Sequence, residues 1–208
     1  MNKLTKVFLT CTIIFMTGCN LFREPPTEKP VIYLYPENTT EVDVKVNLDG
    51  KFTATYPKYN DGWKVVAEPD GTLHALDNEN SYYYLFWEGV VNYTPDFSTG
   101  FVVKGSETET FLEEALTQLG LNDRERNEFI IYWLPHMQDN AYNLISFQNE
   151  NYTNHATLDI SPKPDTVIRV MMAWKPLKES ITIQPQKLDS VERNGFTVVE
   201  WGGTEYKS

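Results

Sequence analysis

Hydrophobic and polar residues alternate with a period of two along much of the chain, a pattern that predicts β-strands. Residues 41–48 show it most clearly, because valine or leucine at every second position would face a core while charged residues face water. The β-branched and aromatic run at residues 31–35, closed by Pro36, is typical of a well-buried strand. We expect further strands at residues 51–56, 62–67, 72–76, 82–87, 143–147, 156–160, 167–174, 181–183 and 196–201.

Turn sequences separate several of these strands. Asp49 and Gly50 predict a two-residue hairpin between strands 41–48 and 51–56, because both residues tolerate positive φ angles. Residues 68–71, with the sequence Glu-Pro-Asp-Gly, predict another turn with proline at its favoured second position. Short strands at this spacing favour an antiparallel β-sandwich or a partial barrel.

The periodicity becomes helical around residues 106–140. Residues 106–109 have the sequence of a capping box, and apolar residues at helical spacing follow as far as Gly120. A second capping box at residues 122–125 opens another helix, which Pro135 is expected to end or kink. The two helices predict an αα-hairpin inserted between strands.

These elements together predict the fold class α+β, mainly β. The strands that follow the helical pair favour one domain over two, because they would return the chain to the sheets formed before the helices. We therefore expect residues 30–208 to form a single β-rich domain, an antiparallel sandwich or partial barrel that carries the αα-hairpin.

The N-terminal segment, residues 1–18, contains two lysines, no acidic residue and an apolar stretch too short to span a membrane. Small residues at positions 17 and 18 precede Cys19. The segment resembles a bacterial lipoprotein signal peptide, although Met16 stands where that motif most often has leucine. The resemblance implies that lipid is attached to Cys19 and that the mature chain begins there. An ordinary signal peptide or an uncleaved anchor is the alternative.

Residues 19–29 are expected to form a tether, stiffened by two consecutive prolines and hydrated through its charges. Cys11 is the only other cysteine and lies in the segment that would be removed. The mature domain would then lack a thiol for a disulfide, a nucleophile or a metal site. The expected location is the outer face of a bacterial cell membrane, where the protein is extracytoplasmic and lipid-anchored through Cys19.

The formal net charge of the chain is −11, and loss of residues 1–18 with their two lysines makes it −13. Nucleic acids and anionic lipid headgroups are bound through an excess of lysine and arginine, so this balance disfavours both as partners. The lipid on Cys19 is therefore expected to provide the membrane attachment. The expected partners outside the cell are a glycan or an envelope protein.

Aromatic residues are densest between residues 56 and 87. Rings on one face of a sheet can stack on sugars while a nearby carboxylate accepts hydrogen bonds from hydroxyls. On this basis the candidate binding surface consists of Trp63, Tyr83, Trp87 and Glu88. The alternative is that these rings pack in the core, as aromatic residues in strands often do.

Catalytic and metal-binding motifs are weaker. Glu88 would serve a hydrolase only beside a second carboxylate, for which Asp61, Asp70 and Glu200 are candidates. The three histidines are isolated, and no zinc-binding or nucleophile-elbow spacing is present. Residues 77–80 offer oxygen ligands but lack the calcium-loop pattern, which favours a hydrated loop. We therefore predict no metal site and no cofactor, and we assign no catalytic residue.

Several blocks of the chain resemble an uncharacterised group of bacterial secreted or lipid-anchored proteins. The resemblance covers most of the mature chain and implies export and a shared fold, but no activity and no functional residue. It rests on the blocks Lys29-Pro30-Val31-Ile32-Tyr33-Leu34-Tyr35-Pro36, Pro69-Asp70-Gly71-Thr72, Tyr84-Leu85-Phe86-Trp87-Glu88 and Phe196-Thr197-Val198-Val199-Glu200-Trp201-Gly202-Gly203.

The functional hypothesis that follows is a non-enzymatic envelope domain that binds a ligand or a partner outside the cell. It rests on the anchor, the tether, the acidic composition and the weakness of the catalytic motifs. One alternative is a carbohydrate-active or other extracytoplasmic hydrolase that uses Glu88 and a second carboxylate. Another is a structural or assembly factor of the envelope.

Overall fold

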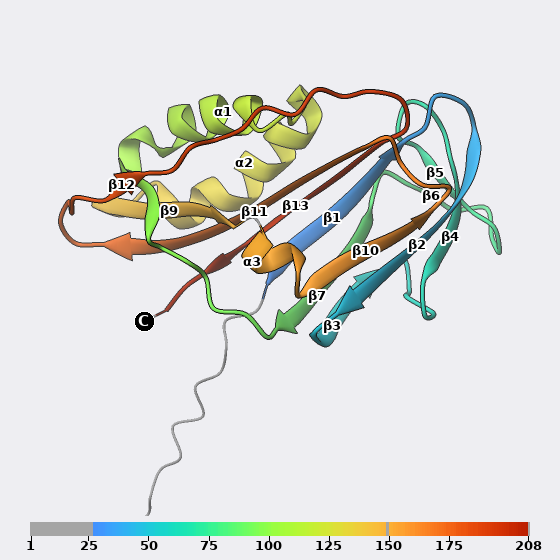
Figure 1. The fold of residues 1–208 in the computed structure, drawn as a ribbon, viewed down its shortest axis with the longest axis horizontal. Helices are drawn as coiled ribbons and strands as arrows, with labels where there is room; N and C mark the ends of the chain where they lie inside the picture. Colours follow the sequence, from blue (N-terminus) through green and yellow to red (C-terminus); the bar gives the residue numbers. More distant parts are fainter. Residues whose placement is uncertain (1–26, 149, 208) are drawn as a thin grey trace, which may run out of the picture.

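The structure, a computed structural model, describes residues 27–148 and 150–207. These residues form three layers, in which a large β-sheet lies between a pair of helices on one face and a smaller β-sheet on the other (Figure 1). Cys19 lies outside the described residues, and so do the signal peptide and most of the tether that the sequence predicts.

The two sheets are separate, so the fold is a sandwich and not a closed barrel. The large sheet has the strand order β12 (Gln184–Pro185), β8 (Thr99–Lys104), β9 (Tyr142–Gln148), β11 (Thr166–Leu177), β13 (Thr197–Glu205), β1 (Glu28–Tyr35), β7 (Leu85–Val91) and β3 (Gly50–Tyr56). The small sheet has the order β10 (Ala156–Ser161), β2 (Thr40–Leu48), β4 (Trp63–Ala67), β5 (Leu73–Ala75) and β6 (Ser81–Tyr82).

The small sheet is antiparallel as predicted, but the large sheet is mixed, because β11 and β13 run parallel along nine paired residues and the short β12 pairs in parallel with β8. A parallel pair needs a crossover connection rather than a tight turn. Residues 178–196 provide it, passing along the helical side of the large sheet (Figure 1). Arg193 fixes this connection, because its guanidinium donates to the carbonyl of Gly120 and forms an ion pair with the buried Glu125 of α2 (Asp123–Met137).

The sequence of β1 has no polar face because both faces of this strand are buried. Successive side chains point to opposite faces of a sheet, and both faces of the large sheet are covered at β1. Ile32 and Leu34 pack between the two sheets, whereas Val31 and Tyr33 pack beneath the helices. All four residues are fully buried.

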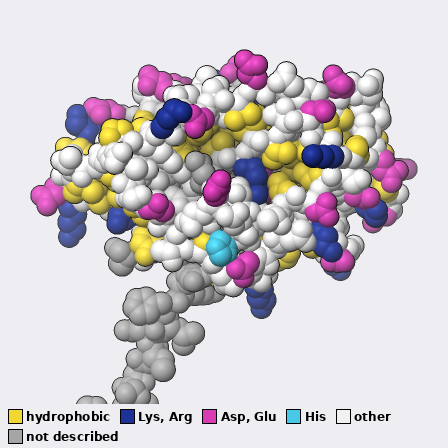
Figure 2. All heavy atoms as spheres, viewed as in Figure 1, with side chains coloured by type: hydrophobic (Ala, Val, Ile, Leu, Met, Phe, Trp, Pro, Cys, Tyr) yellow, Lys and Arg dark blue, Asp and Glu magenta, His cyan; other side chains and the backbone are white. Residues whose placement is uncertain are grey.

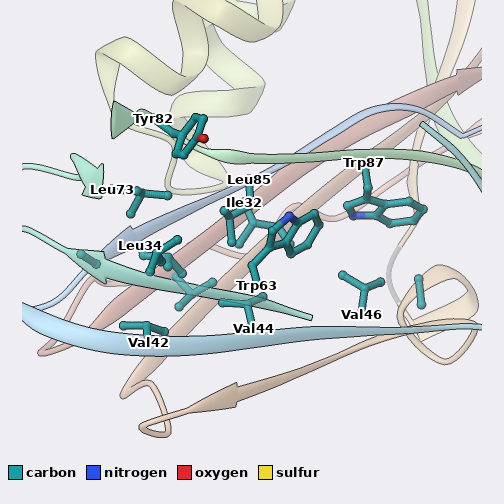
Figure 3. Close-up of a cluster of buried hydrophobic side chains, with 14 of the residues drawn as sticks. Ile32, Leu34, Val42, Val44, Val46, Trp63, Leu73, Tyr82, Leu85 and Trp87 are labelled. Atoms are coloured by element: carbon teal, nitrogen blue, oxygen red, sulfur yellow. The ribbon is translucent and has the colours of Figure 1, made fainter. Parts of the chain in front are cut away.

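The core between the sheets combines aliphatic side chains from β2 with aromatic side chains from β4 and β7 (Figure 3). Val42, Val44 and Val46, the apolar half of the alternating β2 sequence, face this core as predicted. Trp63 of β4 and Trp87 of β7 extend into the same layer from the two opposing sheets (Figure 3). Their large apolar surfaces are removed from water there, which stabilises the sandwich.

The predicted αα-hairpin is present as α1 (Thr108–Gln118) and α2, which pack on each other and cover the other face of the large sheet (Figure 1). The capping box at residues 122–125 is confirmed, because the Asn122 side chain accepts a hydrogen bond from the Glu125 backbone N–H and the Glu125 side chain accepts one from the Asn122 backbone N–H. The box predicted at Ser106 is wrong, since a short 3-10 turn, Gly105–Glu107, precedes α1 without a side-chain cap. Pro135 does not end α2, which continues to Met137.

Three strand predictions need correction. Strands β2 and β3 are separated by Asp49 alone, because Gly50 begins β3, but they belong to different sheets, so the predicted hairpin is a crossing between layers. The strand predicted at residues 82–87 is split into β6 and β7, again in different sheets. Residues 181–183 form no strand, and the short β12 follows them. Local pattern alone does not specify which sheet a strand joins, because the partner strand decides it.

Candidate functional site

The four residues predicted as one binding surface do not lie on one surface. Trp87 is 0% exposed and Trp63 is 3% exposed, while Tyr83 is 60% exposed and Glu88 is half-buried. The alternation along β7 turns Trp87 toward the small sheet together with Leu85. The ring of Trp87 is therefore core, as the alternative interpretation of the sequence held, and no ligand outside the protein reaches it.

Tyr83 lies in the break between β6 and β7, away from the other predicted rings. The guanidinium of Arg124, in the first turn of α2, lies 4.4 Å from the centre of its ring. A cation over an aromatic face is favourable by about 0.5–1 kcal/mol at an exposed site. This contact gives the exposed ring a partner within the protein and ties the β6–β7 junction to α2.

Glu88 and Glu200 lie on opposite faces of the large sheet, so they do not form a catalytic pair. The Glu200 carboxylate accepts a hydrogen bond of 3.2 Å from the Trp87 indole, which places it between the sheets. Glu88 follows Trp87 in β7 and points to the helical side. There its charge contributes to raising the pKa of Tyr132 in α2.

The other two carboxylates considered for this role are engaged elsewhere. Asp61 forms an ion pair with Lys45 of β2 at 3.2 Å. Asp70 accepts a hydrogen bond of 2.8 Å from the backbone N–H of Thr72 within the β4–β5 turn. Donation from Thr72 lowers the pKa of the Asp70 carboxyl, as is usual for a carboxylate that orders a turn.

Glu28 is the carboxylate that the structure brings next to Glu88. Thr27 pairs with Gly89 in a β-bridge, which makes Glu28 and Glu88 neighbours on adjacent strands. The Tyr132 hydroxyl donates to Glu28 at 3.2 Å, and burial followed by the charges of Glu28 and Glu88 raises the pKa of Tyr132 to about 12. Glu28 falls in the predicted tether, and only the pairing of β1 with β7 identifies it as a neighbour of Glu88.

The larger of two adjacent depressions lies at the end of the small sheet and has a volume of about 850 Å³. We call it the groove. Its walls are the β3–β4 connection, the β5–β6 connection and neighbouring residues of β2, β4 and β10. The lining residues are Asp43, Val44, Lys45, Tyr56, Pro57, Lys58, Asn60, Asp61, Gly62, Trp63, Lys64, Val65, Ala75, Leu76, Asp77, Asn78, Asn80, Tyr82, Asp159 and Ser161.

The apolar part of the groove includes side chains that remain open to water. Tyr56, at the end of β3, is 61% exposed, and Leu76, after β5, is 49% exposed. The Tyr56 ring meets the ring of buried Tyr82 edge to face, with centres 5.4 Å apart. Exposed aromatic rings are common on protein surfaces and do not by themselves indicate a function. The Tyr56 ring, however, borders a concave surface, which is the usual setting of a binding site.

The β3–β4 connection, residues 57–62, is fixed by hydrogen bonds to its neighbours. The Tyr59 hydroxyl donates to the carbonyl of Val46 at 3.3 Å and accepts from the N–H of Val46 at 3.1 Å. The Trp63 indole donates to the carbonyl of Pro57 at 2.9 Å. These bonds fix the backbone of this wall of the groove in the ligand-free protein.

A chain of ring contacts joins the groove to the core between the sheets. Tyr59 lies 4.7 Å from Trp63 and 5.0 Å from Phe52, measured between ring centres. Phe52 in turn contacts Trp87 at 5.6 Å. Trp63 thus belongs to the core and to the groove wall at once, and it is the one member of the predicted surface that borders the groove.

The charged side chains around the groove are largely paired with one another. Lys45 pairs with Asp61 at 3.2 Å, and Lys64 pairs with Asp43 across β2 and β4. Both pairs are exposed, so each contributes at most about 1 kcal/mol to stability. Acidic and basic groups also alternate over the face in Figure 2 without forming blocks of one sign. Such a surface offers little attraction to a polyanion.

The smaller depression adjoins the groove, has a volume of about 560 Å³ and shares Lys45 and Asp61 with it. Its notable group is His155, whose Nδ1 lies 2.8 Å from the Asp49 carboxylate. Hydrogen bonding from His155 and then from Asn92 lowers the pKa of Asp49. These contacts join the β2–β3 crossing to the residue before β10 and to the residue after β7, which gives them a structural role.

A buried ion pair lies in the core between the sheets. The guanidinium of Arg169 in β11 contacts the Glu200 carboxylate in β13 at 2.6–2.7 Å, and Glu200 is 1% exposed. Burial disfavours the charged guanidinium, but the Glu200 charge, the Tyr152 phenol and the hydrogen bonds to both together outweigh it and raise the pKa of Arg169. Tyr152 adds its hydroxyl, 3.5 Å from Glu200, and its ring beneath Arg169. We call these residues, with Trp87, the interior cluster.

No group of three potential metal-binding side chains occurs among the described residues. His74 lies 3.0 Å from the Ser81 hydroxyl and 3.8 Å from the Glu68 carboxylate, and all three side chains are on the surface outside the groove. No helix within residues 27–148 and 150–207 is long and apolar enough to cross a membrane.

Comparison of the chain with protein-family models, with curated protein sequences and with solved structures gives no match.

Proposed function

We propose that this protein is a lipid-anchored, extracytoplasmic binding protein without enzymatic activity, whose ligand occupies the groove. The observation that carries the proposal is the groove itself, where exposed Tyr56 and Leu76 border a concave surface of about 850 Å³. Sites for small ligands have volumes of roughly 300–1,000 Å³ and combine an apolar wall with a few polar groups. The groove has this size and composition.

The position of the groove supports an outward-facing role. Glu28, where the tether enters the domain, lies near Gly89 and the β2–β3 crossing. Tyr56 is at the other end of β3, where it pairs with Phe86. If lipid on Cys19 holds the tether at the membrane, the mouth of the groove lies at the end of the strands farther from the tether and is accessible to a ligand outside the cell.

The binding role can be tested without knowing the ligand. The full-length lipoprotein, in detergent micelles, would be heated with and without a protein-free, low-molecular-weight extract of the host envelope. A ligand at 100 times its Kd stabilises the folded state by about 2.7 kcal/mol. For a chain of this length we expect a rise of about 5–10 °C in Tm.

Tyr56→Ala should abolish this rise, and Tyr83→Ala should leave it intact. The two tyrosines are a matched pair, because they are 61% and 60% exposed and only Tyr56 lines the groove. An equal rise in both variants would place the ligand elsewhere. No rise in the unaltered protein would refute the proposed function.

The anchor is tested separately. We expect the unaltered protein to enter the detergent phase on phase separation and the Cys19→Ser variant to stay in the aqueous phase, because the lipid would be attached to the thiol of Cys19. Retention of Cys19→Ser in the detergent phase would contradict the lipid attachment. The groove would be unaffected by that result.

A hydrolase is the second candidate function, because Glu28 and Glu88 are neighbours on adjacent strands beside the Tyr132 hydroxyl. Opposite residues on paired strands have Cβ atoms about 5 Å apart, which allows two carboxyl groups to reach the separation of about 5 Å that retaining glycosidases use. We rank it second because neither carboxylate lines the groove. Release of product from a bound ligand, abolished by Glu88→Gln and by Glu28→Gln, would favour the hydrolase over the binding protein.

A further inference from the structure

We propose that the ligand of the groove is a neutral oligosaccharide, with the ring of Tyr56 stacking on one of its sugars. This inference rests on the proposed binding function and specifies its ligand class. A sugar ring presents an apolar C–H face and a rim of hydroxyl groups. Its recognition therefore needs an exposed aromatic face together with short polar side chains that both donate and accept hydrogen bonds.

Tyr56 meets the first requirement. It is 61% exposed, and its edge-to-face contact with Tyr82 restricts the ring while leaving much of it open. Tyr82 is itself buried and held in β6. A ring that is already positioned loses little conformational entropy when a ligand stacks on it, which favours binding.

The β5–β6 connection meets the second requirement. Asp77 accepts a hydrogen bond of 2.7 Å from the Asn78 side chain, which in turn accepts one of 2.8 Å from the Asn80 backbone. These bonds orient the loop toward one conformation. The Asn80 side-chain amide makes no hydrogen bond within the part of the chain that the structure describes, so it has two donors and an acceptor for hydroxyl groups.

Further hydroxyl-binding groups come from the opposite walls. Asn60 belongs to the β3–β4 connection, and Asp159 and Ser161 belong to β10. All three side chains are short, which suits them to fixed hydrogen bonds better than long flexible chains. A volume of about 850 Å³ leaves room for a short oligosaccharide rather than a single sugar.

The charges of the lining, three lysines and four aspartates, nearly cancel, which favours neutral sugars over charged ones. Lys45 and Lys64 are neutralised by Asp61 and Asp43. The one other lysine of the lining, Lys58, is outnumbered by Asp77 and Asp159. A phosphate, sulfate or uronate group would meet no excess of positive charge here, although such groups are recognised through it.

The test is a calorimetric titration of the full-length lipoprotein in a detergent without sugar headgroups. The probes are neutral tetrasaccharides of glucose, mannose and N-acetylglucosamine, with oligomers of galacturonic acid and glucosamine as charged comparators. We expect at least one neutral oligomer to bind more tightly than both charged comparators. Tyr56→Ala should raise its Kd about tenfold or more.

The matched variants make the result specific. Tyr56→Phe keeps the aromatic face and should change the Kd by less than about threefold, and Tyr83→Ala should behave like the unaltered protein. Trp63 is the one tryptophan in the lining, so ligand binding should change the intrinsic fluorescence. Trp63→Phe should remove that change, while the heat of binding shows whether the variant still binds.

The outcomes separate the ligand class from the binding function. If no neutral oligomer binds through Tyr56 while the envelope extract still raises Tm through Tyr56, the ligand class is wrong and the binding function holds. Tighter binding of a charged oligomer, or binding that Tyr56→Ala leaves unchanged, also overturns the inference. If no oligomer binds and the extract does not raise Tm, both the ligand class and the binding function are refuted.

Discussion

The interior cluster and the groove contain the same kinds of residue but differ in access to water. In the interior cluster, aromatic Trp87 and Tyr152 surround the Arg169–Glu200 ion pair between the sheets. In the groove, aromatic Tyr56 lies in a lining that also holds the Lys45–Asp61 ion pair. Buried ion pairs are costly to break, while exposed pairs contribute little. Burial therefore makes the first region structural and leaves the second free to bind a ligand.

The largest effect is expected from breaking the interior ion pair on one side. Arg169→Met leaves the Glu200 carboxylate, which is 1% exposed, without its cation. We expect a loss of about 3–5 kcal/mol in the free energy of unfolding, measured by urea denaturation. The double variant Arg169→Met with Glu200→Gln should recover part of the loss, because no uncompensated charge remains. If the single variant lost less than about 1 kcal/mol in unfolding free energy, the buried ion pair would contribute no more to stability than an exposed one.

High pH should weaken the interior through its phenols. Burial and then the Glu200 charge raise the pKa of Tyr152 well above 10, and burial raises that of Tyr93. Above the ordinary tyrosine pKa near 10, the unfolded chain loses protons that the folded chain keeps. Stability should thus be complete below pH 10 and fall by about 1.4 kcal/mol per pH unit for each such phenol above it.

Urea unfolding between about pH 8 and pH 11, followed together with tyrosinate absorbance, checks this window. The buried phenols should ionise only as the protein unfolds. Their full ionisation in the folded protein near pH 10 would mean that water enters the interior cluster, and the contrast with the groove would be lost.

A smaller effect is expected from removing the indole donor of the interior cluster. Trp87→Phe deletes volume and also the hydrogen bond to Glu200, so we expect a loss of about 1–3 kcal/mol in unfolding free energy. Trp133→Phe is the matched control, because Trp133 is equally buried and its indole N–H has no hydrogen-bond partner among the described residues. Equal losses in both variants, measured by urea unfolding, would show that volume alone matters at Trp87.

The smallest effect on stability is expected in the groove. Tyr56→Ala should change the free energy of unfolding by no more than about 0.5 kcal/mol, because its side chain is largely exposed. Thermal unfolding without ligand measures this change, and Tyr83→Ala provides the comparison at matched exposure. A loss of several kcal/mol at Tyr56 would mark it as structural, and the division between interior and groove would then need revision.

Much of the fold could be predicted from the local pattern of residues. The alternation at residues 41–48 became β2, the apolar run at residues 31–35 became the core of β1, and the Asn122 capping box opens α2. Each of these depends on neighbours close in sequence. The hairpin at Asp49 failed because two strands that follow one another can join different sheets, and nothing local decides between them.

The candidate site was predicted less well for a related reason. The aromatic stretch that begins near residue 56 includes Trp63, which borders the groove. Whether a ring faces water depends on what covers it, however, and the sequence does not show that the small sheet covers Trp87. Leu76 and the lysines of β2 and β4 carry no motif, so their place in the groove follows only from strand pairing.

The sequence by itself determined most of the strands and both long helices, because period and capping act through residues a few positions apart, but it did not predict β8. It also determined that the described domain is acidic and contains no cysteine. Only the tertiary structure decided that Trp87 and Glu200 meet in the interior while Tyr56 remains at the surface. Residues 113 positions apart become partners through the pairing of strands, and that pairing determines which side chains are removed from water.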